Sequence, residues 1–162
     1  MVIRPAKMGD LPAVFDLMAE MHARSKYADQ GIGMEPVAAK ALLMQSIQRH
    51  GGGNDGSTYF VVAEEDGKIT AFMIGILQRC YLICDRLEAM DVFLYASKDA
   101  GARIAPMLID SYARWADACT KVASIKISYT DALGVDGGAL GRLYTRKGFT
   151  QHGAIFERIK SA

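Results

Sequence analysis

The chain has 162 residues, of which 51% are apolar and 23% are charged, and its formal net charge is +1. This balance excludes a disordered chain and gives no reason to expect a nucleic acid or an anionic membrane surface as the main partner. No apolar run approaches the length of a membrane span, and the first residues lack the form of a signal peptide. We therefore expect one cytoplasmic domain over residues 1–162, large enough to bury a core.

The three cysteines, Cys80, Cys84 and Cys119, are odd in number, and no histidine lies near them at the spacing of metal ligands. An odd count without such spacing favours reduced thiols over a disulfide framework or a zinc site. We expect no bound metal.

The first third of the sequence predicts one strand and two helices. Residues 2–4 are β-prone, and a helix over residues 10–24 has apolar residues at helical spacing after a capping aspartate and a proline. A second helix is predicted over residues 35–49, again with a proline in its first turn. The glycine-rich run at residues 51–56 then breaks the chain.

Three strands are predicted next. Residues 58–63 are rich in β-branched and aromatic side chains, and the sequence Glu-Asp-Gly-Lys at residues 65–68 is typical of a tight hairpin turn. Residues 69–78 supply the second strand of that hairpin, and residues 87–96 supply the strand after it. Together these segments indicate an antiparallel meander.

The last third alternates helix and strand. Residues 104–119 predict a long amphipathic helix, residues 122–128 predict a strand, and a polar, glycine-rich loop leads to a short helix that carries Tyr144. A final strand is predicted near residues 154–159. The whole order is β-α-α-β-β-β-α-β-α-β, which predicts a mixed α/β fold with helices on both faces of a mixed sheet.

The short helix near the C-terminus carries the most informative motif, Leu-Tyr-Thr-Arg-Lys-Gly-Phe at residues 143–149. Tyr144 stands on the apolar face of this helix, and Gly148 is placed to end the helix before Phe149 enters a strand. This motif resembles the last motif of the GCN5-related N-acetyltransferases (the GNAT family), in which the tyrosine lies beside the sulfur of coenzyme A. The element order is also that of the GNAT fold. The alternative is an amphipathic helix whose Tyr144 packs in the core with a satisfied hydroxyl.

A second segment, residues 93–105, resembles the GNAT motif that binds the pyrophosphate of acyl-CoA, Leu-x-Val-x-Pro-x-x-Arg-Gly-x-Gly-x-Gly/Ala. Here it reads Phe-Leu-Tyr-Ala-Ser-Lys-Asp-Ala-Gly-Ala-Arg-Ile-Ala. The segment departs from that pattern where Ser97 replaces the proline, Ala100 the arginine and Arg103 a glycine. The alternative is a capped helix after a strand, as in any α/β protein.

The chemistry of this segment depends on its backbone. A helix N-terminus presents unpaired N–H groups and a partial positive charge, which suit a pyrophosphate. Small residues would let a phosphate approach closely, and Arg103 would restore the missing cation. The resemblance also implies a bulge or splay in the preceding strand, which would free backbone groups of Phe93 and Tyr95 to pair with the amides of pantetheine. The candidate residues for binding acetyl-CoA are Phe93, Leu94, Tyr95, Ala100, Gly101, Ala102, Arg103, Ile104 and Ala105.

Acetyl transfer to an amine needs a neutral nucleophile and a proton for the leaving thiolate. Tyr144 is the candidate general acid, because the resemblance places a phenol near the sulfur. Glu88, ranked first, and Asp91 are the candidate bases, with a water relay as a further option. Their odd spacing puts them on opposite faces of a regular strand, and each could instead be a solvated charge at a strand start. Tyr27, between the first two helices, is the candidate contact with the acceptor, or else an ordinary helix-end residue.

These observations predict an acyl-CoA-dependent N-acetyltransferase that moves an acetyl group from acetyl-CoA to a primary amine of a small molecule or protein. The family resemblance also leads us to expect a homodimer. The alternative is a catalytically weak GNAT-fold module that binds acyl-CoA or regulates, which the departures at Ser97, Ala100 and Gly137 favour. An unrelated nucleotide-binding α/β domain is a third option, disfavoured because no complete glycine-rich fingerprint follows an early strand.

Overall fold

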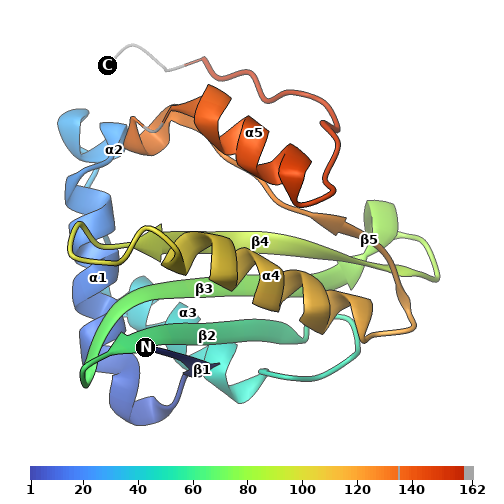
Figure 1. Ribbon diagram of the computed structural model, residues 1–162, viewed down its shortest axis with the longest axis horizontal. Helices are drawn as coiled ribbons and strands as arrows, with labels where there is room; N and C mark the ends of the chain where they lie inside the picture. The colour runs from blue at the N-terminus through green and yellow to red at the C-terminus, as the bar shows by residue number, and fades with distance from the viewer. Residues whose placement is uncertain (135, 159–162) are drawn as a thin grey trace.

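The computed structural model describes residues 1–134 and 136–158, and these residues form a sheet with the strand order β1-β2-β3-β4-β5 (Figure 1). The strands are β1 (Val2–Pro5), β2 (Thr58–Glu65), β3 (Lys68–Arg79), β4 (Leu87–Ala96) and β5 (Val122–Lys126). Neighbours pair antiparallel from β1 to β4, whereas β5 runs parallel to β4. The mixed sheet predicted from the sequence is therefore confirmed.

Helices occupy the longer connections. The described helices are α1 (Leu11–Ala23), α2 (Lys26–Asp29), α3 (Pro36–Gln48), α4 (Ile104–Asp117) and α5 (Gly137–Arg146), with short 3-10 turns η1 (Met8–Asp10), η2 (Cys80–Leu82) and η3 (Asp131–Leu133). Because α4 joins two parallel strands, its N-terminus lies near the end of β4 where the chain leaves the sheet. No helix in the described part of the chain is long and apolar enough to cross a membrane.

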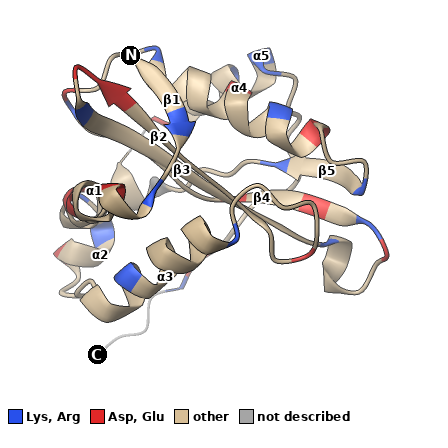
Figure 2. Ribbon diagram, turned by 90° about the horizontal axis from the view of Figure 1, so that it is seen from below, with Lys and Arg blue, Asp and Glu red and all other residues tan. Residues whose placement is uncertain are grey.

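The sheet has a helical layer on each face (Figure 2). Tyr59 and Val61 of β2 point into a core with α4, while Phe60 and Val62 point into a second core with α1 and α3. This alternation is the period of two that a strand imposes on its side chains. All four side chains are nearly fully buried, and each such burial contributes roughly 1.5–3 kcal/mol to the driving force for folding.

The ends of the helices follow local sequence signals. Glu35 caps α3, since its carboxylate accepts two N–H groups of the first turn, and Pro36 is the first helical residue. Gly148 follows α5 with a φ of +88°, and the N–H of Phe149 reaches back to the carbonyl of Tyr144 at 3.0 Å. Glycine takes this left-handed conformation without a steric penalty, so Gly148 ends the helix as predicted.

The strand predicted at the C-terminal end is wrong. Residues 149–158 contain no strand, and Ile159 lies outside the described residues. The side chains of Ile155 and Phe156 are 80% and 95% exposed. Gly153 has a φ of +106°, which interrupts an extended segment, and β-prone residues form a strand only where a neighbouring strand pairs with them.

A β-bulge at Val92 changes the direction of side chains along β4. In the pairing with β3, Gly75 lies opposite Asp91 and Ile74 lies opposite Phe93, so Val92 is the extra residue. Odd-numbered side chains of β4 face α4 before the bulge and face α1 after it. The bulge that the family resemblance implies is therefore present.

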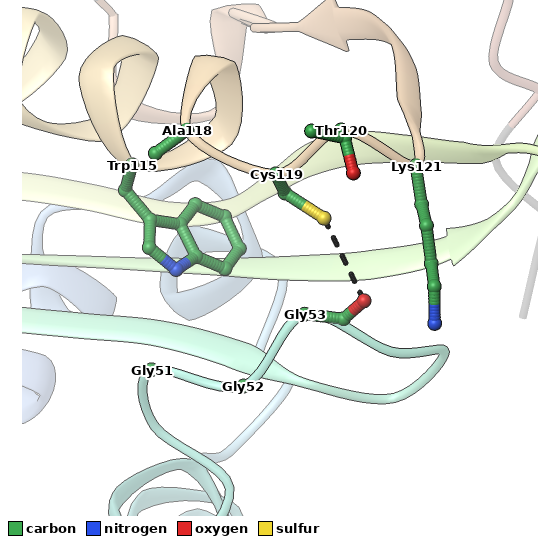
Figure 3. Close-up of a pocket in the computed structure, with 8 residues that line it drawn as sticks. All are labelled: Gly51, Gly52, Gly53, Trp115, Ala118, Cys119, Thr120 and Lys121. Carbon is green, nitrogen blue, oxygen red and sulfur yellow. Dashed lines mark hydrogen bonds between the residues drawn. The ribbon is translucent and has the colours of Figure 1, made fainter.

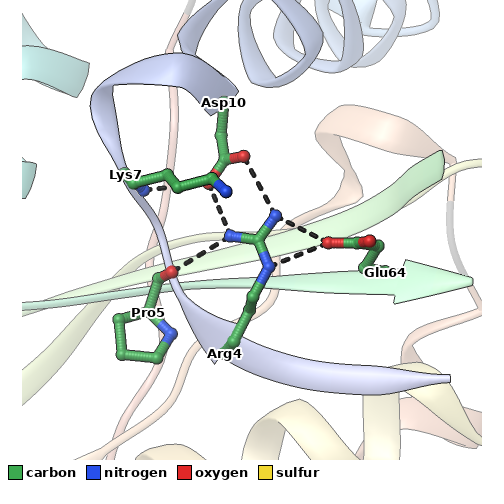
Figure 4. Close-up of polar contacts among 5 residues, drawn as sticks. All are labelled: Arg4, Pro5, Lys7, Asp10 and Glu64. Carbon is green, nitrogen blue, oxygen red and sulfur yellow. Dashed lines mark hydrogen bonds and ion pairs between the residues drawn. The ribbon is translucent and has the colours of Figure 1, made fainter. Parts of the chain in front are cut away.

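Arg4 holds the N-terminal strand to the first turn and to β2 (Figure 4). Its guanidinium donates to the two carboxylate oxygens of Asp10 at 2.7 and 3.0 Å and to Glu64 at 2.8 Å. Asp10 also accepts the backbone N–H of Lys7 and is nearly fully buried. The hydrogen bonds from Arg4 hold the pKa of Asp10 below its usual value. The sequence predicts that Asp10 caps α1. Its side chain makes no capping hydrogen bond and pairs with Arg4 instead.

Candidate functional site

The sheet opens between β4 and β5. These strands pair over Leu87–Met90, and the last pair joins Met90 to Lys126. β4 continues to Ala96, and no strand of the described residues pairs with Asp91–Ala96 on the side of β5. Figure 1 shows the chain after β5 turning away from β4 toward α5. The opening predicted beside residue 93 is therefore present.

The bulge decides which backbone groups face this opening. The N–H of Ser97 donates to β3 at 2.9 Å, and bonded positions alternate along an antiparallel ladder. The backbone of Tyr95 therefore also faces β3, whereas the backbone groups of Leu94 and Ala96 face the opening. The prediction that Phe93 and Tyr95 offer free groups is wrong, because the extra residue in the bulge inverts the alternation.

The start of α4 supplies free donors beside this edge. Arg103 is the N-cap residue and makes no capping bond with its side chain. Within the described chain, the backbone N–H groups of Gly101, Ala102, Arg103 and Ala105 have no acceptor, while that of Ile104 bonds to the carbonyl of Gly101 at 2.9 Å. Unpaired N–H groups at the positive end of a helix dipole suit an anionic phosphate.

The charge around the start of α4 is mixed. Arg103 is exposed and makes no ion pair with the residues that the structure describes, so it can supply positive charge. A Cβ atom on Gly101 would lie 3.5 Å from Oε1 of Glu65, which places one carboxylate near the free N–H groups. Ala100, at the position of the family's arginine, packs against the core under α4. The positive charge of Arg103 therefore has to offset the negative charge of Glu65 as well as that of any bound phosphate.

Tyr144 lies on α5 with its ring near those of Tyr129 and Phe149, at centroid distances of 6.0 and 6.3 Å. Its side chain is 8% exposed, and its hydroxyl donates to the carbonyl oxygen of Ser128 at 3.1 Å. Burial, followed by the negative charge of Asp91, raises the pKa of Tyr144 to about 12. The phenol therefore keeps its proton at neutral pH, and it has the satisfied hydroxyl of a core residue.

Glu88 is 5% exposed and has two partners. Its Oε2 lies 2.7 Å from Nζ of Lys126, and its Oε1 accepts a hydrogen bond from Gln78 at 2.9 Å. Burial opposes the charge of Glu88, but these partners outweigh burial and lower the pKa of the carboxyl. Glu88 is therefore neither a solvated charge nor a free base.

Asp91 and Glu88 lie on opposite faces of β4, as their spacing predicts. The carboxylate of Asp91 accepts the N–H of Ser128 at 2.9 Å and its Oγ–H at 3.1 Å. Burial raises the pKa of Asp91, and the hydrogen bonds from Ser128 act against this effect. The carboxylate thus ties β4 to the segment that leaves β5.

Two residues of this site, Lys126 and Ser128, are not predicted from the sequence. Both lie at the end of the predicted strand 122–128, which indicates only that they are near β4. Which side chains meet depends on the register, and the pairing of β4 with β5 shifts between Leu87 and Glu88. A shift of one residue exchanges the faces of a strand, so the contacts could not be read from the pattern.

Tyr27 lies on α2, where it is 39% exposed. The ammonium of Lys26 lies 5.9 Å from the centroid of its ring, and Glu157 pairs with the same ammonium. α2 packs beside η3, which belongs to the connection between β5 and α5. Tyr27 is therefore exposed on the side of the molecule where that connection runs.

Two cavities lie away from the opening. One, of about 340 Å³, lies between the glycine loop 51–53 and the C-terminal end of α4, with Trp115, Cys119 and Lys121 in its wall (Figure 3). The other, of about 320 Å³, lies between α1 and α3. The candidate site is therefore an open strand edge with a helix start, and not one of these cavities.

Searches with the sequence find no matching family model and no significant match among curated proteins. Solved structures do match. An aminoglycoside antibiotic 6′-N-acetyltransferase from Acinetobacter haemolyticus is 13% identical, with a TM-score of 0.69 over 100% of this chain and 99% of that chain. AAC(6′)-Iy, solved in complex with a CoA bisubstrate analogue, is 16% identical, with a TM-score of 0.71 over 99% of this chain and 98% of that chain.

A point mutant of the protein BH1408 from Bacillus halodurans is 18% identical, with a TM-score of 0.75 over 99% of this chain and 100% of that chain. At such identities the likeness shows the fold. The chain has the fold of these matched structures, which confirms the GNAT fold implied by its two sequence motifs.

Proposed function

We propose that the chain is an acyl-CoA-dependent N-acetyltransferase, which moves an acetyl group from acetyl-CoA to a primary amine of a small molecule or protein. One observation carries this proposal. The unpartnered N–H groups of residues 101–103 and Ala105 lie next to the unpaired edge of β4, in the GNAT fold. Free donors beside a free strand edge suit a ligand with a pyrophosphate at one end and an amide-bearing arm.

The residues present fit acetyl-CoA. The N–H groups at the start of α4 would hold the pyrophosphate, and Arg103 would add positive charge. The backbone groups of Leu94 and Ala96 would pair with the amides of pantetheine, as an added strand does. Gly101 has no side chain to keep a phosphate away from these N–H groups.

Bound acetyl-CoA would supply the thioester, and Tyr144 is the proposed general acid. A phenol with a pKa of about 12 is a weaker acid than a thiol with a pKa of about 8.5, so full proton transfer from Tyr144 is uphill. Donation of a hydrogen bond to the charge that develops on sulfur is the favourable part of its role. The hydroxyl would turn from the carbonyl of Ser128 to do this.

Both candidate bases already have partners. Glu88 is held by Lys126 and Gln78, and Asp91 is held by Ser128. Direct proton removal by either carboxylate would break these contacts. We therefore propose that the amine loses its proton to solvent through a water relay, in which Glu88 accepts a hydrogen bond from a water and stays ionised.

An amine-bearing small molecule is the acceptor that we favour, because one of the matched structures is an aminoglycoside antibiotic 6′-N-acetyltransferase and another is AAC(6′)-Iy in complex with a CoA bisubstrate analogue. Tyr27 is proposed to contact this acceptor. Its ring is 39% exposed beside the connection from β5 to α5, so a ligand could stack on it.

The second candidate function is a module that binds acyl-CoA without efficient catalysis. It is favoured by the bonded state of the Tyr144 hydroxyl and of both carboxylates. Ala100 in place of an arginine, and Glu65 beside Gly101, would weaken phosphate binding as well.

We also propose a cytoplasmic homodimer. Ile155 and Phe156 are exposed next to one another, and a second copy of the chain would remove them from water. Analytical ultracentrifugation at micromolar concentration should give the mass of a dimer. A monomer mass would contradict this assembly.

Isothermal titration calorimetry with acetyl-CoA, CoA and ATP tests the binding half of the proposal. Both CoA compounds should bind and ATP should not. A screen of amines with detection of the free thiol then tests the chemistry. If acetyl-CoA binds but no amine in the screen causes release of the CoA thiol, the binding module is favoured. If neither CoA compound binds, both functions are contradicted.

A further inference from the structure

The hydrogen bonds of Ser128 join β4 to α5 at the opening of the sheet. Regular pairing ends with Met90 and Lys126, and the next residue of β4 is Asp91. Its carboxylate accepts the N–H of Ser128 at 2.9 Å and the Oγ–H at 3.1 and 3.3 Å. A side chain thus takes the place of the backbone partner that the next rung of the ladder would have supplied.

The same segment is also held by two phenols. The carbonyl of Ser128 accepts the hydroxyl of Tyr144 from α5 at 3.1 Å. Two residues earlier, the carbonyl of Lys126 accepts the hydroxyl of Tyr112 from α4 at 3.0 Å. Side chains from β4, α4 and α5 therefore converge on three consecutive residues, and the partner of the Tyr144 hydroxyl is fixed by Asp91.

We propose that Asp91 is a positioning residue, which holds Ser128 across the opening and thereby fixes the place of the Tyr144 hydroxyl. The inference rests on the proposed function only where it takes Tyr144 to be the acid. A misplacement of about 1 Å at a reacting centre can lower a rate about one hundredfold, so the anchor of the acid matters. The carboxylate of Asp91 is occupied by both donors of Ser128, which sets this role apart from that of a base.

The local sequence supports this arrangement. Asp91 directly precedes the bulged Val92, so it is the last residue of β4 that faces α4 before the alternation inverts. Gly75 lies opposite Asp91, and a Cβ atom on Gly75 would come within 2.6 Å of the ring of Tyr112. Glycine at this position leaves room for the ring whose hydroxyl holds Lys126.

Electrostatics links the same groups. The charge of Asp91 contributes, after burial, to the raised pKa values of Tyr112 and Tyr144. Burial raises the pKa of Asp91, and the two hydrogen bonds from Ser128 counter it. Since Asp91 and Tyr144 both bond to Ser128, we expect a change in the side chain of Asp91 to be measurable at Tyr144.

The first test follows Tyr144 by NMR in the full chain labelled with ¹³C at the tyrosine ζ-carbons, with the resonance assigned from Tyr144→Phe. Asp91→Ala should shift or broaden this resonance. Asp91→Asn keeps an oxygen that can accept the N–H of Ser128, so it should restore most of the wild-type shift. Ser128→Ala is the matched control, because it keeps the N–H and the carbonyl and should leave Tyr144 near its wild-type shift. An unchanged resonance in Asp91→Ala would overturn the proposal.

The second test separates positioning from binding. With an amine from the screen, kcat of Asp91→Ala should fall about tenfold to one hundredfold, and Asp91→Asn should recover most of it. The Kd for acetyl-CoA should stay within about twofold of the wild-type value, since Asp91 lies outside the start of α4. A fall in acetyl-CoA affinity with unchanged kcat would contradict the positioning role.

The two proposals fail in different ways. If the wild-type chain neither binds acetyl-CoA nor acetylates an amine, the proposed function fails, while the Tyr144 resonance still decides whether Asp91 holds Ser128. If Asp91→Ala does not fold by circular dichroism, Asp91→Ser replaces it, because its hydroxyl is too short to reach both donors of Ser128. The same change at Tyr144 is then expected, and its absence overturns the inference.

Discussion

The hydroxyl of Tyr144 donates a hydrogen bond to the carbonyl oxygen of Ser128 at 3.1 Å. The phenol thus has a hydrogen-bond partner even when no ligand is bound. A buried hydroxyl with no hydrogen-bond partner would cost about 1–3 kcal/mol. If Tyr144 is a general acid, its hydroxyl donates to this carbonyl only between turnovers. If Tyr144 is a core residue, the carbonyl of Ser128 is its permanent hydrogen-bond partner. The two roles give different results when the hydroxyl is removed.

Tyr144→Phe should lower kcat by about one hundredfold or more while the Kd for acetyl-CoA changes little. The ring keeps its contacts with Tyr129 and Phe149, so only the hydrogen bond is lost. Unfolding in urea should show a loss of roughly 0.5–1.5 kcal/mol, the usual contribution of one hydrogen bond.

Tyr129→Phe is the matched control for this variant. Tyr129 packs on the ring of Tyr144 but is 47% exposed, so its hydroxyl should affect neither kcat nor stability strongly. A normal kcat in Tyr144→Phe, together with the loss of stability, would assign Tyr144 to the core and not to the chemistry.

Gly101→Val should weaken acetyl-CoA binding by about tenfold or more, because a branched side chain would stand over the free N–H groups at the start of α4. In the free protein a Cβ atom at this position meets only Oε1 of Glu65, at an ordinary contact distance of 3.5 Å. Thermal stability without ligand should therefore change little, which distinguishes a blocked site from a damaged fold.

Glu65→Gln gives the opposite test of the same segment. Removing this carboxylate next to Gly101 should strengthen acetyl-CoA binding, most clearly at low salt, where charges are least screened. Calorimetry of both variants at two salt concentrations checks the pair. Unchanged affinity in Gly101→Val would show that the phosphate is held elsewhere.

Local signals predicted most of the fold. The hairpin turn at Asp66 and Gly67, where both residues have positive φ, follows from the Asp-Gly pair, and β4 spans Leu87–Ala96 as its residues predict. The prediction of a final strand was wrong, because a strand forms only where a neighbouring strand can pair with it. The composition of residues 154–159 does not show whether such a sheet edge is available.

The site was predicted less completely than the fold. Tyr144 and the start of α4 could be proposed from the sequence because their motifs are continuous. Lys126 and Ser128, which bind Glu88 and Asp91, were missed because they come from a parallel neighbour and the segment after it, whose register is not encoded locally. A bulge or splay in this strand was expected, but its position at Val92, which sets the backbone direction of Tyr95, was not.

His50 should make the stability of the chain depend on pH near neutrality. Its Nδ1 accepts the N–H of Phe60 at 2.9 Å, and burial lowers the pKa of His50 below 6.5. As the pH falls through 6.5, the unfolded chain takes up this proton first. The contribution of His50 is therefore complete above pH 6.5, is lost as the pH falls from there, and stops changing below the pKa of the folded state.

His50→Asn is the matched variant, because its Oδ1 can accept the N–H of Phe60 and does not titrate near neutrality. Urea unfolding at several pH values between 5 and 8 should give a steeper fall in stability for the wild-type chain than for His50→Asn. Parallel curves for the two proteins would show that His50 does not bind its proton more weakly when folded.

Asp10 should control stability in acid. Its carboxylate is nearly fully buried against Arg4, and the hydrogen bonds from Arg4 lower its pKa from the usual 3.8. Since the unfolded chain then protonates first, the stabilisation is complete above pH 3.8 and is lost as the pH falls through the pKa of the folded state. Acid unfolding of the wild-type chain should therefore begin in this range.

Asp10→Asn should lose roughly 1–3 kcal/mol at neutral pH, because Arg4 keeps Glu64 but loses its charged bonds to Asp10. The difference from the wild-type chain should shrink as the pH falls from 3.8 through the lower pKa of the folded state, because the stabilisation by the charged carboxylate is lost over that range. Asp16→Asn is the matched control, since Asp16 lies exposed on α1 and should change stability little at either pH. A difference between Asp10→Asn and the wild-type chain that stays constant with pH would mean that packing around the side chain, and not its charge, holds β1 to the first turn.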